Sequence, residues 1–238
     1  MRLLSEKIEF PPHETATKEG VLALGGDLSP KRLLFAYRNG IFPWYSLDEP
    51  IVWYSPKKRM VLFPKELKIS KSMTKIIKKN KFEITENQAF EEVIHQCKNI
   101  IRNDNLGTWI TDDMEQAYIK LHKKGYAKSI EVWSLDSNSD VLGKSKKNLA
   151  SIINPNCITN GIGPEDFTRL YGLEIGNIFC GESMFSKVSN TSKIAFIHLV
   201  NNHNYQLIDC QVYNNHLASL GAREILRDDF LQKIKCIG

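Results

Sequence analysis

The sequence predicts a layered protein of the α/β or α+β class, on three observations. Segments with the apolar spacing of helices alternate with short apolar segments typical of strands, most clearly over residues 111–134 and 191–221. The 238 residues, 42% hydrophobic and 10% aromatic, can form a full core in one large domain or two smaller ones. The chain has no apolar run long enough to cross a membrane, and residues 1–10 carry charged side chains. We therefore expect a cytoplasmic protein that does not associate with membranes.

The cysteines and the charge narrow the class of protein further. The cysteines are odd in number and show no CxxC or histidine-spaced pattern, so neither a disulfide framework nor a zinc site is expected. They are Cys97, Cys157, Cys180, Cys210 and Cys236, which we interpret as free thiols, mostly in the core. The net charge of +5 permits a polyanionic partner without requiring one. GxxxxGK[ST], GxGxxG and HExxH are absent, which favours chemistry without a metal or another cofactor.

The first part of the chain predicts one short helix between irregular segments and strands. Residues 1–28 contain the turn-forming sequences "FPPHE" and "LALGGDLSP" and are expected to be irregular. Ser29 as N-cap, Pro30 at the first helical position and Gly40 as a stop predict a helix between them. The stretches "GIFPWYS" and "IVWYSPKKRMVLF" predict strands interrupted at Pro56.

Two features of this region allow more than one interpretation. The aromatic residues Trp44, Tyr45, Trp53 and Tyr54 are typical of a small-domain core. Residues 64–81 hold seven lysines and one glutamate, and a helix over residues 72–79 would bring several of these lysines near one face. The lysines concerned are Lys71, Lys75, Lys78 and Lys79. Such a face is equally typical of a solvated helix and of a contact with nucleic-acid phosphates.

The remainder alternates helices and strands. Apolar spacing predicts a helix within residues 87–99, and Thr111 as N-cap predicts another that ends at Gly125, before the strand "KSIEVWS". A helix over residues 191–200, a buried strand "YQLIDCQV" and a short helix closed by Gly221 follow. Residues 134–168 are rich in Ser, Asn, Lys, Gly and Pro, which predicts a surface excursion between two strands.

Three polar side chains stand out in apolar surroundings. Glu182 lies in "FCGESMFSK", where a carboxylate either turns to water or is half-buried and needs a partner. Asp209 and Gln211 lie in "LIDCQV", where strand alternation puts both on one face and Cys210 on the other. Such residues are more often structural than catalytic, because buried polar groups usually satisfy nearby backbone groups.

Eight motifs, in order along the chain, together resemble the leucyl/phenylalanyl-tRNA-protein transferases of bacteria. They are "LALGGDLSP", "YRNGIFPWYS", "WYSPKKRMVL", "GTWIT", "GYAKSIEVW", "FCGESMFSK", "LIDCQV" and "HLASLGAREI". The resemblance implies an α+β protein with a small N-terminal α/β domain (1–60) and a mixed-sheet catalytic domain (61–238) similar to the GNAT acetyltransferase fold. It also implies a monomer that transfers leucine or phenylalanine, and less well methionine, from aminoacyl-tRNA to the N-terminal Lys or Arg of acceptor proteins. The product carries an N-end rule degradation signal.

The resemblance also implies roles for individual residues. Asp209 would polarise Gln211, whose amide oxygen orients the attacking amine or takes its proton; loss of that proton to water or to the departing tRNA hydroxyl is an equal alternative. Glu182 would hold a cationic or hydrogen-bond-donating part of the substrates, at the N-terminal end of the acceptor. The binding residues implied are Leu170 and Phe179 for the transferred side chain, Trp44 and Trp109 for the terminal adenine, Asn214 for substrate, and the four lysines for the acceptor stem.

One departure from the family pattern is a polar insertion at about residues 144–168, next to the expected pocket. If the insertion loops outward it costs little closure entropy and the activity is kept. If it displaces the strand that carries Leu170 and Tyr171, the side-chain pocket changes.

Two other functions stay open at this point. An acyl-CoA-dependent N-acetyltransferase would need a pyrophosphate-binding Arg/Gln-x-x-Gly-x-Gly/Ala loop, but "RLYGLE" has Glu174 where Gly or Ala is required. A non-catalytic tRNA-binding module would use the lysines and tryptophans alone and would tolerate loss of Asp209.

Overall fold

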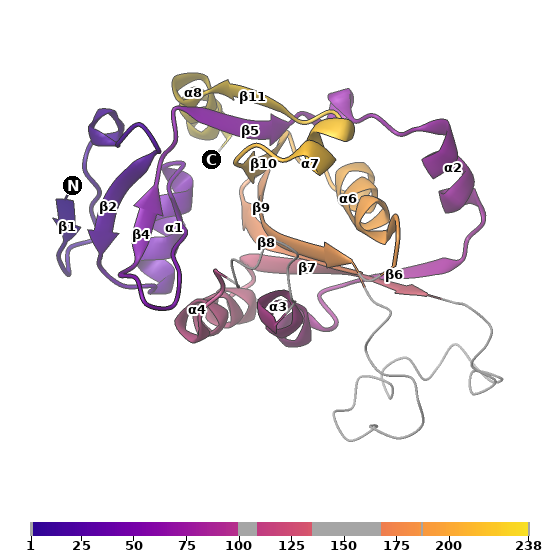
Figure 1. Ribbon diagram of the computed structural model, residues 1–238, viewed down its shortest axis with the longest axis horizontal. Coiled ribbons are helices and arrows are strands. Elements are labelled where there is room, and N and C mark those ends of the chain that lie inside the picture. The colour runs from indigo at the N-terminus through magenta and orange to yellow at the C-terminus, as the bar shows by residue number, and fades with distance from the viewer. Residues whose placement is uncertain (1, 100–108, 135–167, 187, 238) are drawn as a thin grey trace, which may run out of the picture.

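The computed structural model describes residues 2–99, 109–134, 168–186 and 188–237. These residues form a mixed arrangement of helices with two separate sheets, a small one and a larger, curved one (Figure 1). Cys157 and almost all of the predicted insertion at 144–168 lie outside the described residues. Within the described part, no helix combines the length and the apolar character needed to cross a membrane.

The small sheet has the strand order β1-β2-β4-β3. β1 (Arg2–Leu4) runs parallel to β2 (Val21–Gly25), and β4 (Val52–Tyr54) pairs antiparallel with β2 and with β3 (Phe42–Pro43). The prediction that residues 1–28 are irregular is therefore wrong for two strands. Turn-forming residues on either side hid the short β2, whose stability comes from pairing with a strand far along the chain.

The short helix predicted after Ser29 is confirmed, and it packs against the small sheet. α1 (Pro30–Arg38) begins where the Ser29 side chain accepts a hydrogen bond from the backbone N–H of Arg32. Its buried residues form one hydrophobic cluster with β2 and with Trp53, which is 0% exposed. Trp44 is 42% exposed, so this member of the predicted aromatic core lies at the surface instead.

The large sheet has the strand order β11-β5-β10-β9-β8-β7-β6. Its strands are β5 (Lys58–Leu62), β6 (Phe82–Glu86), β7 (Ala127–Ser134), β8 (Thr168–Ile175), β9 (Ile178–Ser186), β10 (Leu207–Gln211) and β11 (Arg223–Leu226). β9 and β10 run parallel, and the other neighbouring strands pair antiparallel. The strands predicted after Gly125 and over 205–212 are both confirmed.

Helices cover both faces of the large sheet (Figure 1). α3 (Phe90–Asn99) and α4 (Asp112–Lys123) pack on one face, and α6 (Thr191–Asn202) packs inside the curve of the other. Each face has its own hydrophobic cluster, and strand alternation divides β8 between them: Leu170 belongs to the cluster with α6 and Tyr171 to the other.

The other helices lie at the ends of strands. α2 (Lys71–Lys78) is the lysine-bearing helix predicted at 72–79, α7 (Asn215–Ser219) follows β10, and α8 (Arg227–Ile237) follows β11. Two short 3-10 helices, His13–Thr15 and Pro64–Glu66, complete the described elements.

Candidate active site

A cavity of about 460 Å³ is lined by residues of both sheets. β3 and Trp44 contribute from the small sheet, and β8, β9 and β10 contribute from the large one, together with α6 and α7. All the catalytic and substrate-binding residues predicted from the sequence line this cavity. They are Trp44, Trp109, Leu170, Phe179, Glu182, Asp209, Gln211 and Asn214.

One part of the cavity wall is apolar. Leu170, Phe179 and Phe196 line it and are each less than 5% exposed. Gly172 makes room for this wall, because a Cβ at that position would lie 2.6 Å from the Phe179 ring and 2.3 Å from the Cys180 carbonyl oxygen. A side chain larger than hydrogen at position 172 would therefore displace the Phe179 ring or the β9 backbone.

The strand that follows the polar segment keeps its place in the sheet. β8 pairs with both β7 and β9, and Leu170 lies opposite Ile130 on one side and Met184 on the other. Of the two alternatives for the insertion, the pairing of β8 supports the one in which the side-chain pocket is preserved.

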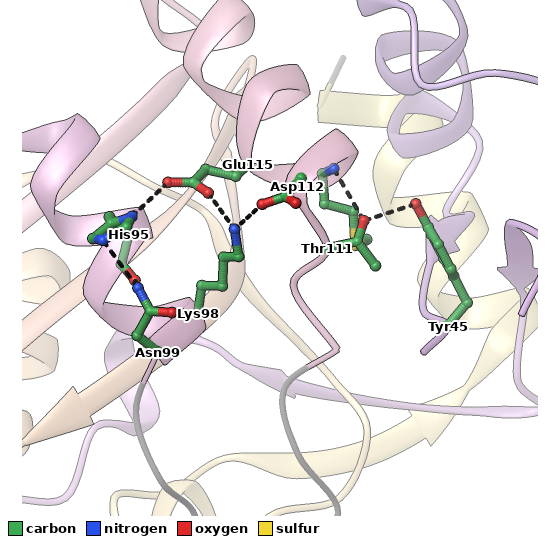
Figure 2. A network of polar contacts seen from close by, with 8 residues as sticks. Tyr45, His95, Lys98, Asn99, Thr111, Asp112 and Glu115 are labelled. Atoms are coloured by element: carbon green, nitrogen blue, oxygen red, sulfur yellow. Dashed lines mark hydrogen bonds and ion pairs between the residues drawn. The ribbon is translucent and has the colours of Figure 1, made fainter. Parts of the chain in front are cut away.

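The two cavity tryptophans come from distant parts of the chain. Trp44 follows β3 and packs against Tyr54, with 5.6 Å between ring centroids. Trp109 is half-buried and lies two residues before Thr111, the N-cap of α4. The hydroxyl groups of Tyr45 and Thr111 are 3.3 Å apart, so a hydrogen bond links the two segments that carry the tryptophans (Figure 2).

A polar network fixes the start of α4 against the end of α3 (Figure 2). Lys98 donates to the Oε2 atom of Glu115 at 2.8 Å and also pairs with Asp112, while His95 contacts the Oε1 atom of Glu115 at 3.1 Å. The side chains of Lys98 and Glu115 are 18% and 11% exposed, so this pair is shielded from water. We call Lys98, Asp112 and Glu115 the α3–α4 clasp; it fixes the start of α4, which directly follows the segment that carries Trp109.

Asp209 is paired with a residue that the sequence did not identify. The Nε and Nη2 atoms of Arg59 lie 2.8 and 2.6 Å from the two carboxylate oxygens of Asp209, and both residues are 1% exposed. The guanidinium group lies over the rings of Phe42 and Phe230, 4.4 and 4.8 Å from their centroids. Bidentate geometry of this kind fixes the position of the carboxylate as well as its charge.

Gln211 sits on a distortion of β10. The register against β5 shifts between Asp209 and Gln211, and Gln211 has a left-handed φ of 60°. Its backbone N–H donates to Asp209 Oδ1 at 2.9 Å, and its side-chain Nε2 donates to Glu182 Oε1 at 2.8 Å. Cys210 also lines the cavity, but it packs against the α6-side hydrophobic cluster, on the face opposite the Asp209–Arg59 ion pair, as alternation predicts.

Glu182 is buried and contacts three side chains. Besides the Gln211 amide, the Tyr37 hydroxyl donates to Oε1 at 2.6 Å and the Tyr118 hydroxyl lies 2.8 Å from Oε2. The two tyrosine hydroxyls are themselves 2.6 Å apart. Burial raises the pKa of Glu182 from 4.5 to about 8, against the effect of the hydrogen bonds from the tyrosines.

The other predicted residues have simpler surroundings. Asn214 caps α7, because its side-chain oxygen accepts hydrogen bonds from the backbone N–H groups of His216 and Leu217. The four predicted lysines are exposed on or next to α2 and are not among the residues lining the cavity.

Sequence reasoning missed Arg59, Tyr37 and Tyr118. The signal for Arg59 was a charged residue directly before the buried strand residues "MVL". Tyr118 lies on the buried face of α4, and nothing local in the sequence indicated that its hydroxyl meets a carboxylate on another element. Tyr37 and Glu182 are 145 residues apart in the sequence, so only the tertiary fold reveals their contact.

The described residues include no group of three His, Cys, Asp or Glu side chains arranged to hold a metal ion. Cys97, Cys180, Cys210 and Cys236 are free thiols, of which Cys97 and Cys180 are buried. Burial raises the pKa of the Cys180 thiol well above its ordinary value, which disfavours the nucleophilic thiolate.

Comparisons with known proteins find the same protein family along almost the whole chain. The family model described as leucyl/phenylalanyl-tRNA protein transferase matches residues 61–142 and 167–235, and the model of the N-terminal domain of that family matches residues 26–57. A leucyl/phenylalanyl-tRNA–protein transferase of Flavobacterium johnsoniae is 49% identical over 99% of both chains. That of Flavobacterium psychrophilum is 47% identical over 99% of this chain and all of its own. That of Yersinia enterocolitica is 45% identical over 98% of this chain and 88% of its own.

Proposed function

Because the chain belongs to the leucyl/phenylalanyl-tRNA protein transferase family, we propose that it transfers leucine or phenylalanine from aminoacyl-tRNA to the N-terminus of acceptor proteins. The observation that carries this proposal is the cavity, in which an apolar wall adjoins Asp209, Gln211 and Glu182. A cavity of this kind holds an apolar side chain next to a small number of polar groups that fix orientation.

The reaction needs positioning more than activation. The ester is supplied by the tRNA, and an α-amine with a pKa of about 7.7 to 8.0 is partly deprotonated near neutral pH. Holding amine and ester together contributes roughly 7 to 11 kcal/mol toward the barrier, so the reaction requires neither a covalent nucleophile nor a metal. The peptide bond forms between the amine nitrogen and the ester carbon, and the amine loses a proton as the ribose hydroxyl leaves.

Gln211 is the residue that we assign to the amine. Its Nε2 group donates to Glu182, and no described residue donates to its amide oxygen. The amide oxygen is therefore the atom that accepts a hydrogen bond from the attacking amine. Asp209 acts through the backbone N–H of Gln211, and Arg59 holds Asp209 in place.

The remaining substrate contacts follow from the cavity wall and the surface. Leu170 and Phe179 receive the transferred side chain, with weaker acceptance of methionine, because apolar walls separate similar side chains by only about 1 to 3 kcal/mol. Trp44 and Trp109 stack on the terminal adenine. The lysines of α2 contact acceptor-stem phosphates, which positions the tRNA without reading its sequence.

We further propose the finer architecture that the family resemblance implies. The mixed seven-stranded sheet supports a GNAT-like catalytic domain over residues 61–238, after an N-terminal domain over residues 1–60. The family match omits residues 143–166, which supports an insertion at about 144–168. The protein acts as a cytoplasmic monomer on acceptors that begin with Lys or Arg, and its product carries an N-end rule degradation signal.

The test is transfer of radiolabelled leucine or phenylalanine from charged tRNA to a protein that begins with Arg or Lys. We expect label in the protein, and none when the acceptor begins with Asp. Binding of tRNA without transfer would contradict the proposal, and a saturable acetyl-CoA signal in calorimetry would favour the acetyltransferase.

A further inference from the structure

Three oxygen-oxygen contacts around Glu182 close into a cycle. Tyr37 Oη lies 2.6 Å from Glu182 Oε1, Tyr118 Oη lies 2.8 Å from Glu182 Oε2, and the two tyrosine oxygens lie 2.6 Å apart. All three distances are typical of O–H···O hydrogen bonds. The side chains come from α1, α4 and β9, so the cycle joins three separate elements.

The number of hydrogen atoms decides the charge of Glu182. Each of the three contacts needs one hydrogen, but the two tyrosine hydroxyls supply only two. An ionised Glu182 would leave one pair of oxygen atoms in close contact without a hydrogen between them. A protonated carboxyl group supplies the third hydrogen and satisfies every contact in the cycle.

The Gln211 amide shows which oxygen carries the proton. Gln211 Nε2 donates to Glu182 Oε1, so Oε1 acts as an acceptor. The proton therefore lies on Oε2, which donates to Tyr118. Tyr118 then donates to Tyr37, and Tyr37 donates back to Oε1.

We propose that Glu182 acts as a neutral carboxylic acid whose proton completes a hydrogen-bond cycle with Tyr37 and Tyr118, and that this cycle orients the Gln211 amide. Tyr37 and Tyr118 are then positioning residues for the transfer reaction. This inference rests on the proposed function for its catalytic meaning, but the protonation state of Glu182 can be tested separately.

The surrounding groups support a neutral Glu182. The titratable and charged groups that face it are Tyr37 on α1, Tyr118 on α4, Asp209 on β10, Arg59 on β5 and Cys180 on its own strand. The single positive charge among them, Arg59, is already paired with Asp209. A second carboxylate charge would therefore have no cation of its own in this buried place.

A neutral Glu182 has a chemical advantage in aminoacyl transfer. An anion beside a bound amine favours the protonated ammonium form, which has no lone pair for attack. A neutral acid still accepts the hydrogen bond from Gln211 Nε2 and so keeps the amide oxygen directed to the amine. The sequence predicts that Glu182 holds either a cation or a hydrogen-bond donor. A neutral Glu182 favours the hydrogen-bond donor.

The first experiment compares rates across pH. The Glu182→Gln variant has an amide that donates to Tyr118 and accepts from Tyr37 as the neutral acid does. We expect measurable transfer by the variant, and a ratio of variant to wild-type rate that rises as pH increases through about 8, because only the wild type loses its proton. The ratio cancels the titration of the substrate amine, which is common to both proteins. A variant that is inactive at every pH, or a ratio that is flat or falls, would overturn the proposal.

The second experiment observes the proton without using activity. The full-length wild-type protein is labelled with ¹³C at the glutamate side-chain carboxyl carbon, and the Glu182 signal is the one absent from Glu182→Gln. We expect this signal at the position of a protonated acid at pH 7, and an ionised signal at pH 7 would overturn the inference. Glu174→Gln is the matched control, because Glu174 also accepts a hydrogen bond from a tyrosine, Tyr205, but is not among the residues that line the cavity.

A third comparison tests the positioning role. Tyr118→Phe removes one hydroxyl from the cycle and keeps the ring, and we expect the transfer kcat to fall roughly tenfold with little change in KM for aminoacyl-tRNA. Tyr205→Phe is the control and should change neither constant. A Tyr118→Phe variant with normal kcat would contradict the positioning role. A wild type that shows a protonated Glu182 but no transfer would reject the proposed function and leave the protonation state established.

Discussion

The guanidinium group of Arg59 and the carboxylate of Asp209 form a two-point ion pair in the protein interior, with N–O distances of 2.8 and 2.6 Å. The same carboxylate accepts the backbone N–H of Gln211, which places that residue at a left-handed φ of 60°. Arg59 therefore influences the geometry of Gln211 through the Asp209 carboxylate.

Removing the charge of Arg59 should be strongly destabilising. Arg59→Met leaves the Asp209 carboxylate buried without its partner, and we expect the free energy of unfolding in urea to fall by about 3 to 5 kcal/mol. Arg59→Lys keeps the charge but loses the bidentate geometry. We expect its free energy of unfolding to lie between those of the wild type and Arg59→Met, and its transfer activity to fall more than its stability. Equal stability of Arg59→Met and the wild type would contradict this account.

The length of the Gln211 side chain should matter more than its amide chemistry. Gln211→Asn suits the left-handed backbone, which Asn tolerates, but its shorter amide does not reach Glu182. We expect a loss of about 1 kcal/mol in unfolding free energy, as for one lost hydrogen bond, and loss of turnover, while tRNA binding stays normal. Asp209→Ala should likewise remove turnover and spare tRNA affinity. Matched losses of turnover and affinity would indicate that these residues bind tRNA instead.

The buried Glu182 should make stability depend on pH. Its pKa is raised from 4.5 to about 8 in the folded protein, so between these values the folded state binds more protons than the unfolded state. The stabilisation is complete below pH 4.5 and is lost as pH rises through 8, with a limiting slope of about 1.4 kcal/mol per pH unit. Chemical denaturation from pH 5 to 9 measures this slope. Glu182→Gln should flatten the dependence and Glu174→Gln should not.

The α3–α4 clasp should influence tRNA binding through Trp109. Lys98→Met leaves Glu115 short of a partner, and we expect a loss of about 1 to 3 kcal/mol in unfolding free energy together with a severalfold higher KM for aminoacyl-tRNA. The double variant Lys98→Met/Glu115→Leu leaves no uncompensated charge in this pair and should recover most of the stability. An unchanged KM in both variants would show that Trp109 does not depend on the clasp.

The lysine face of α2 should contribute affinity that is sensitive to salt. Replacing Lys71, Lys75, Lys78 and Lys79 with Gln should weaken tRNA binding and reduce the slope of log K against log salt by about one unit for each phosphate that is no longer neutralised. Titrations at several salt concentrations measure this slope. Lys120→Gln/Lys124→Gln is the control and should leave the slope unchanged, because these exposed lysines lie on α4 and at its C-cap.

Local signals in the sequence predicted most elements of the fold. The caps at Ser29 and Thr111 act through neighbouring backbone groups, so they can be read within a few residues. β2 was missed because its partner, β4, lies far along the chain and the glycines beside it indicated a turn. The bulge at Gln211 was not predicted, because a β-bulge depends on the neighbouring strand, which alternation alone does not include.

For the candidate site too, the sequence predicted some residues and missed others. Family motifs identified the residues that line the cavity, including Trp44 and Trp109 from distant segments. Their partners Arg59, Tyr37 and Tyr118 were not predicted, because each makes its contact across tens of residues or more. The pKa of Glu182 follows from these contacts and from burial, and it is therefore a property of the tertiary fold.

The buried guanidinium of Arg59 lies over the rings of Phe42 from β3 and Phe230 from α8. A ribosome must therefore have added Phe230 before the ion pair at the cavity can be enclosed. Nascent chains and products of premature termination that lack α8 have Asp209 and Gln211 but not the enclosure that fixes them. Copies that stop before α8 should therefore lack the fixed ion pair, although they contain all of the residues that line the cavity.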